Sequence, residues 1–264
     1  MSSVPDHAES VAVDACLRGG RYLREAFQDG DTDADHMETD VKSSADVEAE
    51  ERMLDVLKRV FPNHTIYAEE SGVHTGTDGY RWIVDPLDGT NNFEAGLPSF
   101  GSAVTLLVED TPELGVAYLP IADELYVCRR GEGLRYDGDV VDDAEAPVPD
   151  PGSETVMSVI GHDVVLDPDT RAVSERINRG IEAACKRRLE SWSPTVHWGL
   201  LARGRIDGAV SYRPDVEEQQ LGELFVEEVG HETASGEEWF VAARTAELRE
   251  RLVEVATDAV RGGD

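Results

Sequence analysis

The sequence predicts a mixed α/β fold in which β-sheets are layered with α-helices. The chain has 264 residues, of which 40% are hydrophobic, and this is enough to bury a substantial core. Segments with helical periodicity open the chain, a strand-rich region follows, and helices and strands then alternate to the end. This order of elements is typical of sheets covered by helices.

The first elements are two amphipathic helices, expected at residues 8–27 and 46–61, because their apolar residues recur at helical spacing. Two short apolar segments, 65–67 and 80–84, have the composition of buried strands. Each strand runs directly into acidic residues at its carboxyl end. Ligands often bind at the ends of strands in α/β proteins, so this placement favours a functional site there.

A strand-rich region follows and ends at an acidic, proline-containing stretch at residues 137–152, which marks the best boundary between two lobes. We therefore expect an N-terminal α+β lobe at 1–150 and a C-terminal α/β lobe at 151–264. Strands are expected at 103–108, 114–118, 124–129, 155–160, 187–189, 206–211 and 239–242. Helices of the second lobe are expected at 170–184, 193–202, 217–229 and 245–260.

The formal net charge is −31, and the chain contains three lysines, Lys42, Lys58 and Lys186. A polyanion with so few lysines is repelled by nucleic acid, which excludes non-specific nucleic-acid binding as a function. The spread of acidic residues, with arginine in place of lysine, resembles proteins from salt-accumulating halophiles, where molar salt shortens the Debye length to about 3 Å.

No apolar run approaches the roughly 20 residues of a membrane span. The first residues do not resemble a signal peptide, so we expect a cytoplasmic protein.

The three cysteines, Cys16, Cys128 and Cys185, are far apart and odd in number. This pattern indicates neither a disulfide framework nor a zinc site, and we expect all three to be small buried residues.

The most informative segment is Trp82–Phe93, where a buried strand is followed by two aspartates, a glycine and a threonine. Asp85 and Asp88 can bracket one or two magnesium ions, because carboxylate and carbonyl oxygens are the ligands that hard cations prefer. Pro86 stiffens the expected turn between them. Taken alone, Asp-Gly-Thr more often marks a turn that caps a helix.

The full segment resembles the signature of the inositol monophosphatase family, in which a strand leads into Asp-Pro-hydrophobic-Asp-Gly-Thr-x-Asn-Phe. Four other segments resemble the same family in the same order. They are 42–50, which contains Asp46, 67–72, which resembles Gly-Glu-Glu-Ser with Ala68 in place of glycine, 96–120, which resembles the strands that follow the signature, and 228–230, which resembles Glu-Ala-Gly. The resemblance is to the archaeal inositol monophosphatase and fructose-1,6-bisphosphatase type. It implies an αβαβα sandwich with the metal-binding motifs in the first lobe and a substrate pocket completed by the second.

The resemblance also implies two or three Mg²⁺ ions in each active site. Glu69, Asp85 and the Leu87 carbonyl would hold the first ion. Asp85, Asp88 and a carboxylate from the late motif would hold the second.

Catalytic roles are implied for Thr90, Asp46 and Glu69. Metal-activated water would attack the phosphate, and the Thr90 hydroxyl, oriented by Asp46, would help to deprotonate it. An alternative for Asp46 is a helix amino-terminal cap. Asp88, Gly89, Thr90 and Glu218 would surround the phosphate, with backbone amides of the Gly89–Thr90 turn as further donors.

The late motif departs from the family pattern, because Glu217–Glu218 stands where Trp-Asp is expected. Glu218 is our choice for the late metal ligand and Asp215 is the alternative. A third interpretation is that these acids are solvated residues at a helix start.

The family's Gly-Ser-Ala-Ala element corresponds to residues 191–194. Trp192 and Trp198 are expected to pack in the interior rather than shape a pocket. Arg213 either contacts a second anionic group of the substrate or forms a surface ion pair.

These observations predict a Mg²⁺-dependent phosphomonoesterase that acts on a small polyol or sugar phosphate, with myo-inositol monophosphate and fructose 1,6-bisphosphate as leading substrates. One alternative is a nucleotidase for adenosine 3',5'-bisphosphate. Another is a catalytically impaired relative with a binding or regulatory role. The family resemblance implies a homodimer. From the net charge and the lack of a long apolar run, we expect neither nucleic acid nor a membrane as a partner.

Overall fold

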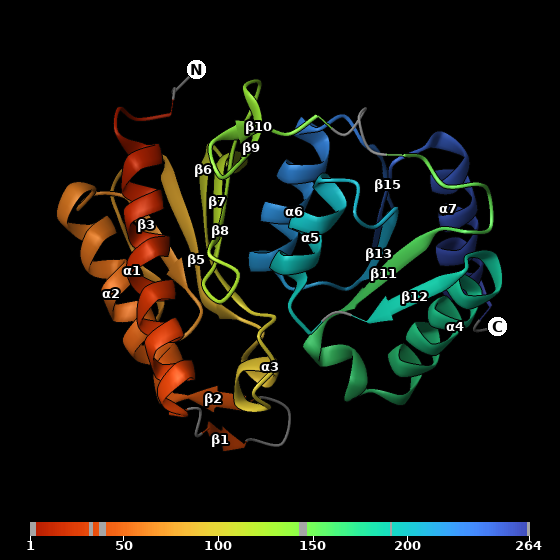
Figure 1. Ribbon diagram of the computed structural model, residues 1–264, viewed down its shortest axis with the longest axis horizontal. Helices are drawn as coiled ribbons and strands as arrows, with labels where there is room; N and C mark the ends of the chain where they lie inside the picture. The colour runs from red at the N-terminus through yellow and green to blue at the C-terminus, as the bar shows by residue number, and fades with distance from the viewer. Residues whose placement is uncertain (1–3, 32–33, 37–40, 143–146, 191, 263–264) are drawn as a thin grey trace.

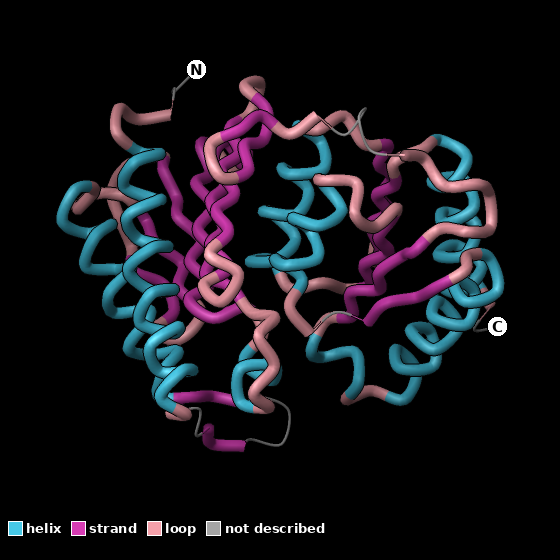
Figure 2. The backbone as a smooth tube through the Cα atoms, in the orientation of Figure 1, coloured by secondary structure: helices cyan, strands magenta, loops and turns pink. Residues whose placement is uncertain are grey.

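The computed structural model describes residues 4–31, 34–36, 41–142, 147–190 and 192–262. Five layers follow one another across the molecule: helices, a sheet, helices, a second sheet and helices (Figure 1). Figure 2 shows the same order as two groups of strands with helices outside and between them. The expected αβαβα arrangement is therefore confirmed.

The first layer consists of α1 (Ala8–Asp29) and α2 (Ser44–Val60). Both helices are amphipathic and bury their apolar faces against the first sheet, where α1 contacts β7 (Thr111–Leu119) and α2 contacts β5 (Tyr80–Asp88). Cys16 and Met53 are fully buried in the core that forms there. A separate hairpin of β1 (Ala34–His36) and β2 (Val41–Ser43) connects the two helices.

The second layer is an eight-stranded sheet with the order β10-β9-β8-β7-β6-β5-β3-β4. β3 and β5 pair in parallel, and the other neighbours in this sheet pair antiparallel. After β5, the short helix α3 (Thr90–Glu94) leads to the next strand. The remaining strands of this sheet are Thr65–Ala68 (β3), Gly72–His74 (β4), Gly101–Val108 (β6), Glu124–Arg129 (β8), Gly133–Tyr136 (β9) and Asp139–Val140 (β10).

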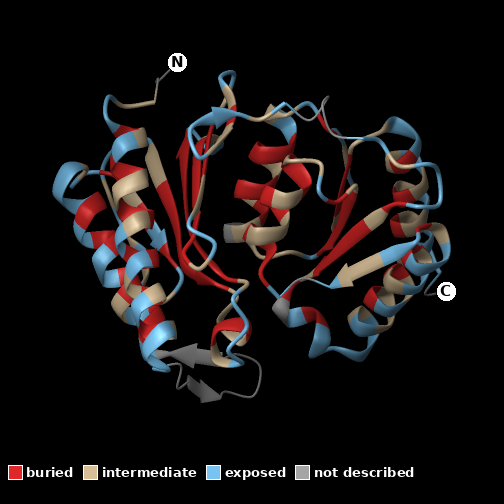
Figure 3. Ribbon diagram, in the orientation of Figure 1, coloured by how far each residue is buried: buried red, intermediate tan, exposed pale blue. Residues whose placement is uncertain are grey.

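The middle layer consists of α5 (Pro194–Ala202) and α6 (Val216–Glu228), which lie between the two sheets (Figure 1). Figure 3 shows that these helices are buried over most of their surface, whereas the outer helices alternate between buried and exposed faces. Trp198 is fully buried and lies directly against Gly222, where a side chain would collide with the indole ring. One continuous core therefore joins the first sheet, the middle helices and the second sheet.

The second sheet has the order β12-β11-β13-β15-β14 and is covered by α4 (Pro168–Ala184) and α7 (Ala246–Arg261). The chain enters this sheet after β10, and a 3₁₀ helix at His162–Val165 (η2) follows the first strand. The first three strands in its order are parallel, and the last two pair antiparallel. Its strands are Thr155–Ile160 (β11), Arg187–Glu190 (β12), Gly208–Tyr212 (β13), Glu232–Ser235 (β14) and Trp239–Ala243 (β15).

Every helix and strand predicted from periodicity is present, with ends that differ from the predicted ones by zero to four residues. The missed strands, which include β4, β9, β10 and β14, are two to four residues long and mostly polar or exposed. Such short strands at or next to a sheet edge carry no clear alternation of apolar and polar residues, because little of them faces the core.

Candidate active site

The parallel pair β3 and β5 brings two acidic residues side by side. Ala68 pairs with Val84 in the register of these strands, and the backbone N–H of Glu69 donates to the Val84 carbonyl at 3.2 Å. Glu69 and Asp85 are the next residues on their strands, so both lie at the same edge of the sheet. Asp85 is buried at 5% exposure, whereas Glu69 is exposed.

A bulge near the end of β5 decides where Asp88 lies relative to Asp85. Asp85 pairs with Ala103 of β6, and Asp88 pairs with Gly101. The paired positions are three residues apart on β5 but two residues apart on β6, so β5 contains one extra residue here. Side chains alternate between the faces of a strand, so residues three apart normally point in opposite directions. The extra residue cancels this reversal, and Asp85 and Asp88 therefore lie on the same face of the sheet.

The bulge contains Pro86 and replaces the turn expected between the two aspartates, so the expectation of a turn is wrong. Proline occurs within sheets mainly at bulges and edges, because it has no N–H to donate to the ladder. The Ser102 hydroxyl donates to the Pro86 carbonyl at 2.7 Å and satisfies the acceptor at this irregular point. The sequence Asp-Pro-Leu-Asp thus encodes the bulge that aligns the two carboxylates.

The start of α5 holds the Asp88 carboxylate. Its Oδ2 atom accepts from the Thr195 backbone N–H at 2.5 Å and lies 3.1 Å from the Ser193 hydroxyl. The same hydroxyl lies 3.2 Å from the Asp88 carbonyl oxygen. A carboxylate at a helix amino terminus is stabilised by the unpaired N–H groups and by the helix dipole. The contact ties the end of β5 to the start of α5, and sequence reasoning missed both partners.

The turn into α3 is shaped by Gly89 and Thr90. Gly89 has φ of 99°, and a Cβ atom there would lie 2.9 Å from Ser193 Cβ, so only glycine fits. The Thr90 hydroxyl donates to the Leu87 carbonyl at 3.2 Å. A carbonyl oxygen has two lone pairs, so the Leu87 oxygen can still accept from a second group or a cation.

Helix α2 contributes two buried acids, Asp46 at 2% exposure and Glu50 at 3%. They are one helical turn apart, and Ala45 and Ala49 pack against the Leu87 side chain, so this face of α2 is turned toward the β5 bulge. Because α2 begins at Ser44, Asp46 lies in the first turn, and its interpretation as the helix cap is wrong. Its predicted contact with Thr90 stays a prediction.

Glu50 fixes the loop that carries Glu69. Its two carboxylate oxygens accept from the backbone N–H groups of Glu70 at 2.7 Å and Ser71 at 3.0 Å. These two hydrogen bonds set the direction of the chain directly after Glu69. Glu50 is therefore a positioning residue for Glu69. The spacing of four residues from Asp46 was the available signal in the sequence.

The late motif lies at the start of α6. Asp215 is the N-cap residue, and Glu218 follows in the first turn with a half-buried position. Helix α6 contacts β5 and β6, the strands of the bulge. Glu218 as the late metal ligand, with Asp215 as the alternative, stays a prediction.

The donor set suits a hard divalent cation, because Glu69, Asp85, Asp88 and the Leu87 carbonyl offer oxygen atoms alone. Asp85 and Asp88 are almost fully buried, and buried charges in proteins are normally paired or bound to metals. Within the described ranges, however, no three His, Cys, Asp or Glu side chains already stand close enough to hold an ion.

Two titratable side chains near these acids are held neutral. Burial raises the pKa of the Cys16 thiol, and the charge of Asp85 raises it further, which excludes Cys16 as a thiolate nucleophile. Burial lowers the pKa of His197 in α5. Its Nδ1 lies 3.0 Å from the Ser193 carbonyl, which can only accept, so Nδ1 carries the proton. All three cysteines are free and buried, as predicted.

The other residues singled out from the sequence have structural positions. Trp198 is buried as predicted, but Trp192 is 56% exposed, so the prediction of interior packing is wrong for it. Arg213 forms an ion pair with Glu238 at 3.1 Å. Glu228, the last residue of α6, accepts from the backbone N–H groups of Gly131 at 2.9 Å and Gly133 at 3.0 Å. It therefore anchors the turn before β9.

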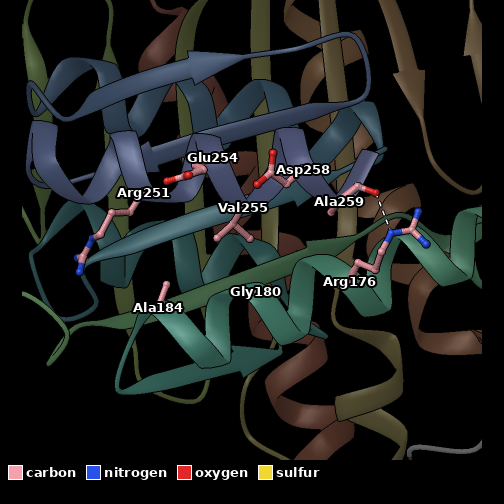
Figure 4. A pocket seen from close by; sticks show the side chains of 8 residues that line it. All are labelled: Arg176, Gly180, Ala184, Arg251, Glu254, Val255, Asp258 and Ala259. Atoms are coloured by element: carbon pink, nitrogen blue, oxygen red, sulfur yellow. Dashed lines mark hydrogen bonds between the residues drawn. The ribbon is translucent and has the colours of Figure 1, made fainter. Parts of the chain in front are cut away.

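A separate hollow lies between the outer helices α4 and α7 (Figure 4). Arg176 of α4 crosses it to donate to the Ala259 carbonyl at 2.9 Å, and Gly180 leaves room for Val255. These helices cover the outside of the second sheet, so none of the candidate residues lines this hollow.

Similarity to known proteins shows the family of this chain. The model of the inositol monophosphatase family matches residues 5–247. This chain belongs to the inositol monophosphatase family. The match covers the β5 bulge, the buried acids of α2 and the start of α6, so every residue of the candidate site lies within the matched range.

Relatives in the family carry different names. The chain is 35% identical to Nus factor SuhB of Pasteurella multocida over 133 residues, which is 48% of each chain. It is 38% identical to a fructose-1,6-bisphosphatase/inositol-1-monophosphatase of Aquifex aeolicus over 132 residues, or 48% of this chain and 49% of the relative. The matched segment thus spans about half the length of these relatives.

Among solved structures, the chain is similar to the extragenic suppressor protein suhB of Bartonella henselae. The TM-score is 0.82 at 24% identity, with 94% of this chain and 97% of the other covered. This likeness shows the fold. None of the helices in the described parts of the chain is sufficiently long and apolar to cross a membrane.

Proposed function

We propose that this family member is a Mg²⁺-dependent phosphomonoesterase that hydrolyses a small polyol or sugar phosphate. The observation that carries the proposal is the β5 bulge, which places Asp85 and Asp88 on one face of the sheet beside Glu69. Three carboxylates at one strand edge match the need of phosphoryl transfer for cations that neutralise the phosphate oxygens.

Bound Mg²⁺ ions would polarise the phosphoryl group and supply activated water. Glu69, Asp85 and the Leu87 carbonyl would hold one ion, and Asp85, Asp88 and Glu218 another. Thr195 and Ser193 hold the Oδ2 atom of Asp88, which fixes the orientation of this carboxylate.

Thr90 and Asp46 would manage the proton of the attacking water. Rotation of the Thr90 hydroxyl away from the Leu87 carbonyl, 3.2 Å distant, would let it accept a hydrogen bond from water and donate toward Asp46. Burial of Asp46 at 2% exposure makes such a hydrogen bond stronger than it would be in water. Backbone N–H groups of the Gly89–Thr90 turn would donate to the phosphate.

The substrate class is tested by phosphate release from myo-inositol monophosphate, fructose 1,6-bisphosphate and adenosine 3',5'-bisphosphate. Mg²⁺ and molar potassium chloride should be present, because a net charge of −31 destabilises the fold in dilute buffer. We expect turnover of one or both of the first two compounds and its loss on chelation. Turnover of the third alone would favour a nucleotidase, and no turnover of any would contradict the proposal.

Replacing Glu218 with glutamine should raise the Mg²⁺ concentration needed for half-maximal rate by about 100-fold or more, because loss of a charged metal ligand exceeds the roughly ten-fold to 100-fold effect of losing a residue that supports one. Mg²⁺ titrations of the rate measure this directly. Asp215→Asn is the matched comparison, since that residue caps the same helix. An effect confined to Asp215→Asn would transfer the role to Asp215, and no effect of either would leave the site without a late ligand.

A binding or regulatory role is the second candidate, because Glu217–Glu218 replaces the family's Trp-Asp and no three-acid group is preassembled in the described parts of the chain. A pure binding protein would take up the phosphate ester without releasing phosphate. Calorimetry beside the phosphate assay separates the two functions. We also propose, from the family resemblance, a cytoplasmic homodimer.

A further inference from the structure

The carboxyl end of α5 is fixed to the first sheet by Arg203, the residue that caps this helix. Its guanidinium lies over the Tyr136 ring of β9, 3.6 Å from the ring centroid. Its Nη1 atom donates to the Tyr126 hydroxyl of β8 at 3.0 Å and lies 3.4 Å from a carboxylate oxygen of Glu124. We call Arg203, Glu124, Tyr126 and Tyr136 the arginine cluster.

Hydrogen bonds join the other members of the arginine cluster to one another. One carboxylate oxygen of Glu124 accepts from the Tyr136 hydroxyl at 2.9 Å, and the other accepts from the Tyr126 hydroxyl at 3.2 Å. Burial raises the pKa of Tyr126, so this hydroxyl keeps the proton that it donates. The Arg203 and Glu124 side chains are 18% and 25% exposed, so salt screens their interaction less than it screens an exposed ion pair. The cluster therefore holds the end of α5 in one geometry.

The backbone of α5 also lies directly on the first sheet at this end. Gly199 is one turn before Arg203, and a Cβ atom there would lie 2.7 Å from the Tyr126 ring. The same ring belongs to the arginine cluster and is fully buried. A cation at the carboxyl end of a helix is further stabilised by the helix dipole. Gly199 thus sets the distance of α5 from β8, and Arg203 sets the position of α5 along its own axis.

The amino end of the same helix holds Asp88. The Thr195 backbone N–H donates to Asp88 Oδ2 at 2.5 Å. Thr195 and Arg203 are eight residues apart, or roughly 12 Å along the axis at 1.5 Å per residue. An α-helix makes its backbone hydrogen bonds within itself, so a shift along the axis at one end is passed to the other. A shift of roughly 1 Å would break the bond to Asp88, because hydrogen bonds do not extend to 3.6 Å.

We propose that Arg203 is a positioning residue for Asp88: the arginine cluster fixes α5 so that the Thr195 N–H meets the Asp88 carboxylate. The effect on Mg²⁺ binding rests on the proposed function, whereas the effect on this hydrogen bond does not. The sequence did not single out Arg203, because its partners Glu124 and Tyr126 lie 79 and 77 residues earlier in the chain.

The first test measures amide hydrogen exchange in the full chain without divalent cations. Arg203→Met removes the guanidinium but keeps a long unbranched side chain. The Thr195 amide should exchange about five-fold to ten-fold faster, the effect of one lost hydrogen bond. The amide of Val210, in the interior of the second sheet, should exchange as before. Arg203→Lys keeps the charge and should restore part of the protection.

The second test measures the Mg²⁺ concentration needed for half-maximal phosphate release. It should rise about three-fold to ten-fold in Arg203→Met, less than for a residue that contacts a metal ligand directly. Arg205→Met is the matched control for both tests, since this exposed arginine follows two residues later. If the chain releases no phosphate from any ester, the proposed function fails, and the exchange of the Thr195 amide still decides the role of Arg203.

A second variant covers the case in which Arg203→Met does not fold. Tyr136→Phe keeps the ring beneath Arg203 and removes the hydroxyl that holds Glu124, so it should speed exchange of the Thr195 amide about two-fold to five-fold. The proposal is overturned if the Thr195 amide keeps its exchange rate in the folded variant, or if the Val210 amide speeds up equally. It is also overturned if Arg205→Met has the same effect, or if phosphate release by Arg203→Met needs no more Mg²⁺ than before.

Discussion

Replacement of Asp85 by asparagine should reduce the rate of phosphomonoester hydrolysis at least about 100-fold. Loss of a residue that only orients a metal ligand typically costs ten-fold to 100-fold, and loss of the charged ligand itself should cost more. Asp85 is the residue that both proposed ions share. It is 5% exposed and stands on the same face as Asp88 because of the bulge. Asparagine keeps the shape and one oxygen but removes the charge. Initial rates in saturating Mg²⁺ measure the effect.

The loss must be separated from unfolding. Mg²⁺ should raise the melting temperature of the unmodified chain, since a ligand that binds only the folded state stabilises it, and this rise should disappear in Asp85→Asn. Asp110→Asn is the control, because this aspartate forms only an exposed pair with Arg81 at 2.8 Å. A folded Asp85→Asn protein with the rate and the Mg²⁺ stabilisation of the unmodified chain would disprove the site at β5.

The sequence was sufficient for the residues whose positions follow from local pattern. Strand-end acids such as Glu69 and Asp85 could be predicted as neighbours, because two apolar segments each ran into a carboxylate and parallel strands end at one edge. The buried cysteines and the helix that begins at Pro194 also followed from composition and periodicity. The spacing of apolar residues along a helix or strand shows which of its faces is buried, and this spacing is a property of the local sequence.

What the sequence could not provide are contacts between segments far apart in the chain. Ser193 and Thr195 hold Asp88 across more than 100 residues, and nothing in either segment alone specifies the other. The bulge was read as a turn, because proline suggests a turn unless the pairing strand is known. Trp192 was expected inside because aromatic residues usually are, but it is 56% exposed just before the buried start of α5.

Glu50→Gln should lower the rate about ten-fold to 100-fold, the range for residues that orient a metal ligand rather than bind the metal. Glu50 accepts from two successive backbone N–H groups, those of Glu70 and Ser71, and needs two oxygens to do so. Glutamine replaces one oxygen with an NH₂ donor, which would face an N–H donor. The loop after Glu69 must then shift, and the Glu69 carboxylate moves with it.

A positioning role differs from a purely structural one in its Mg²⁺ dependence. The Glu50 variant should need more Mg²⁺ for half-maximal rate, and higher Mg²⁺ should recover part of the activity, because the ligand is displaced rather than removed. A variant that was only less stable would lose rate equally at all Mg²⁺ concentrations once its folded fraction was corrected for. Glu51→Gln is the control, since the neighbouring glutamate is exposed on the same helix. Equal Mg²⁺ requirements in the two variants would show that the α2 carboxylate supports the fold alone, and that Glu69 finds its place without it.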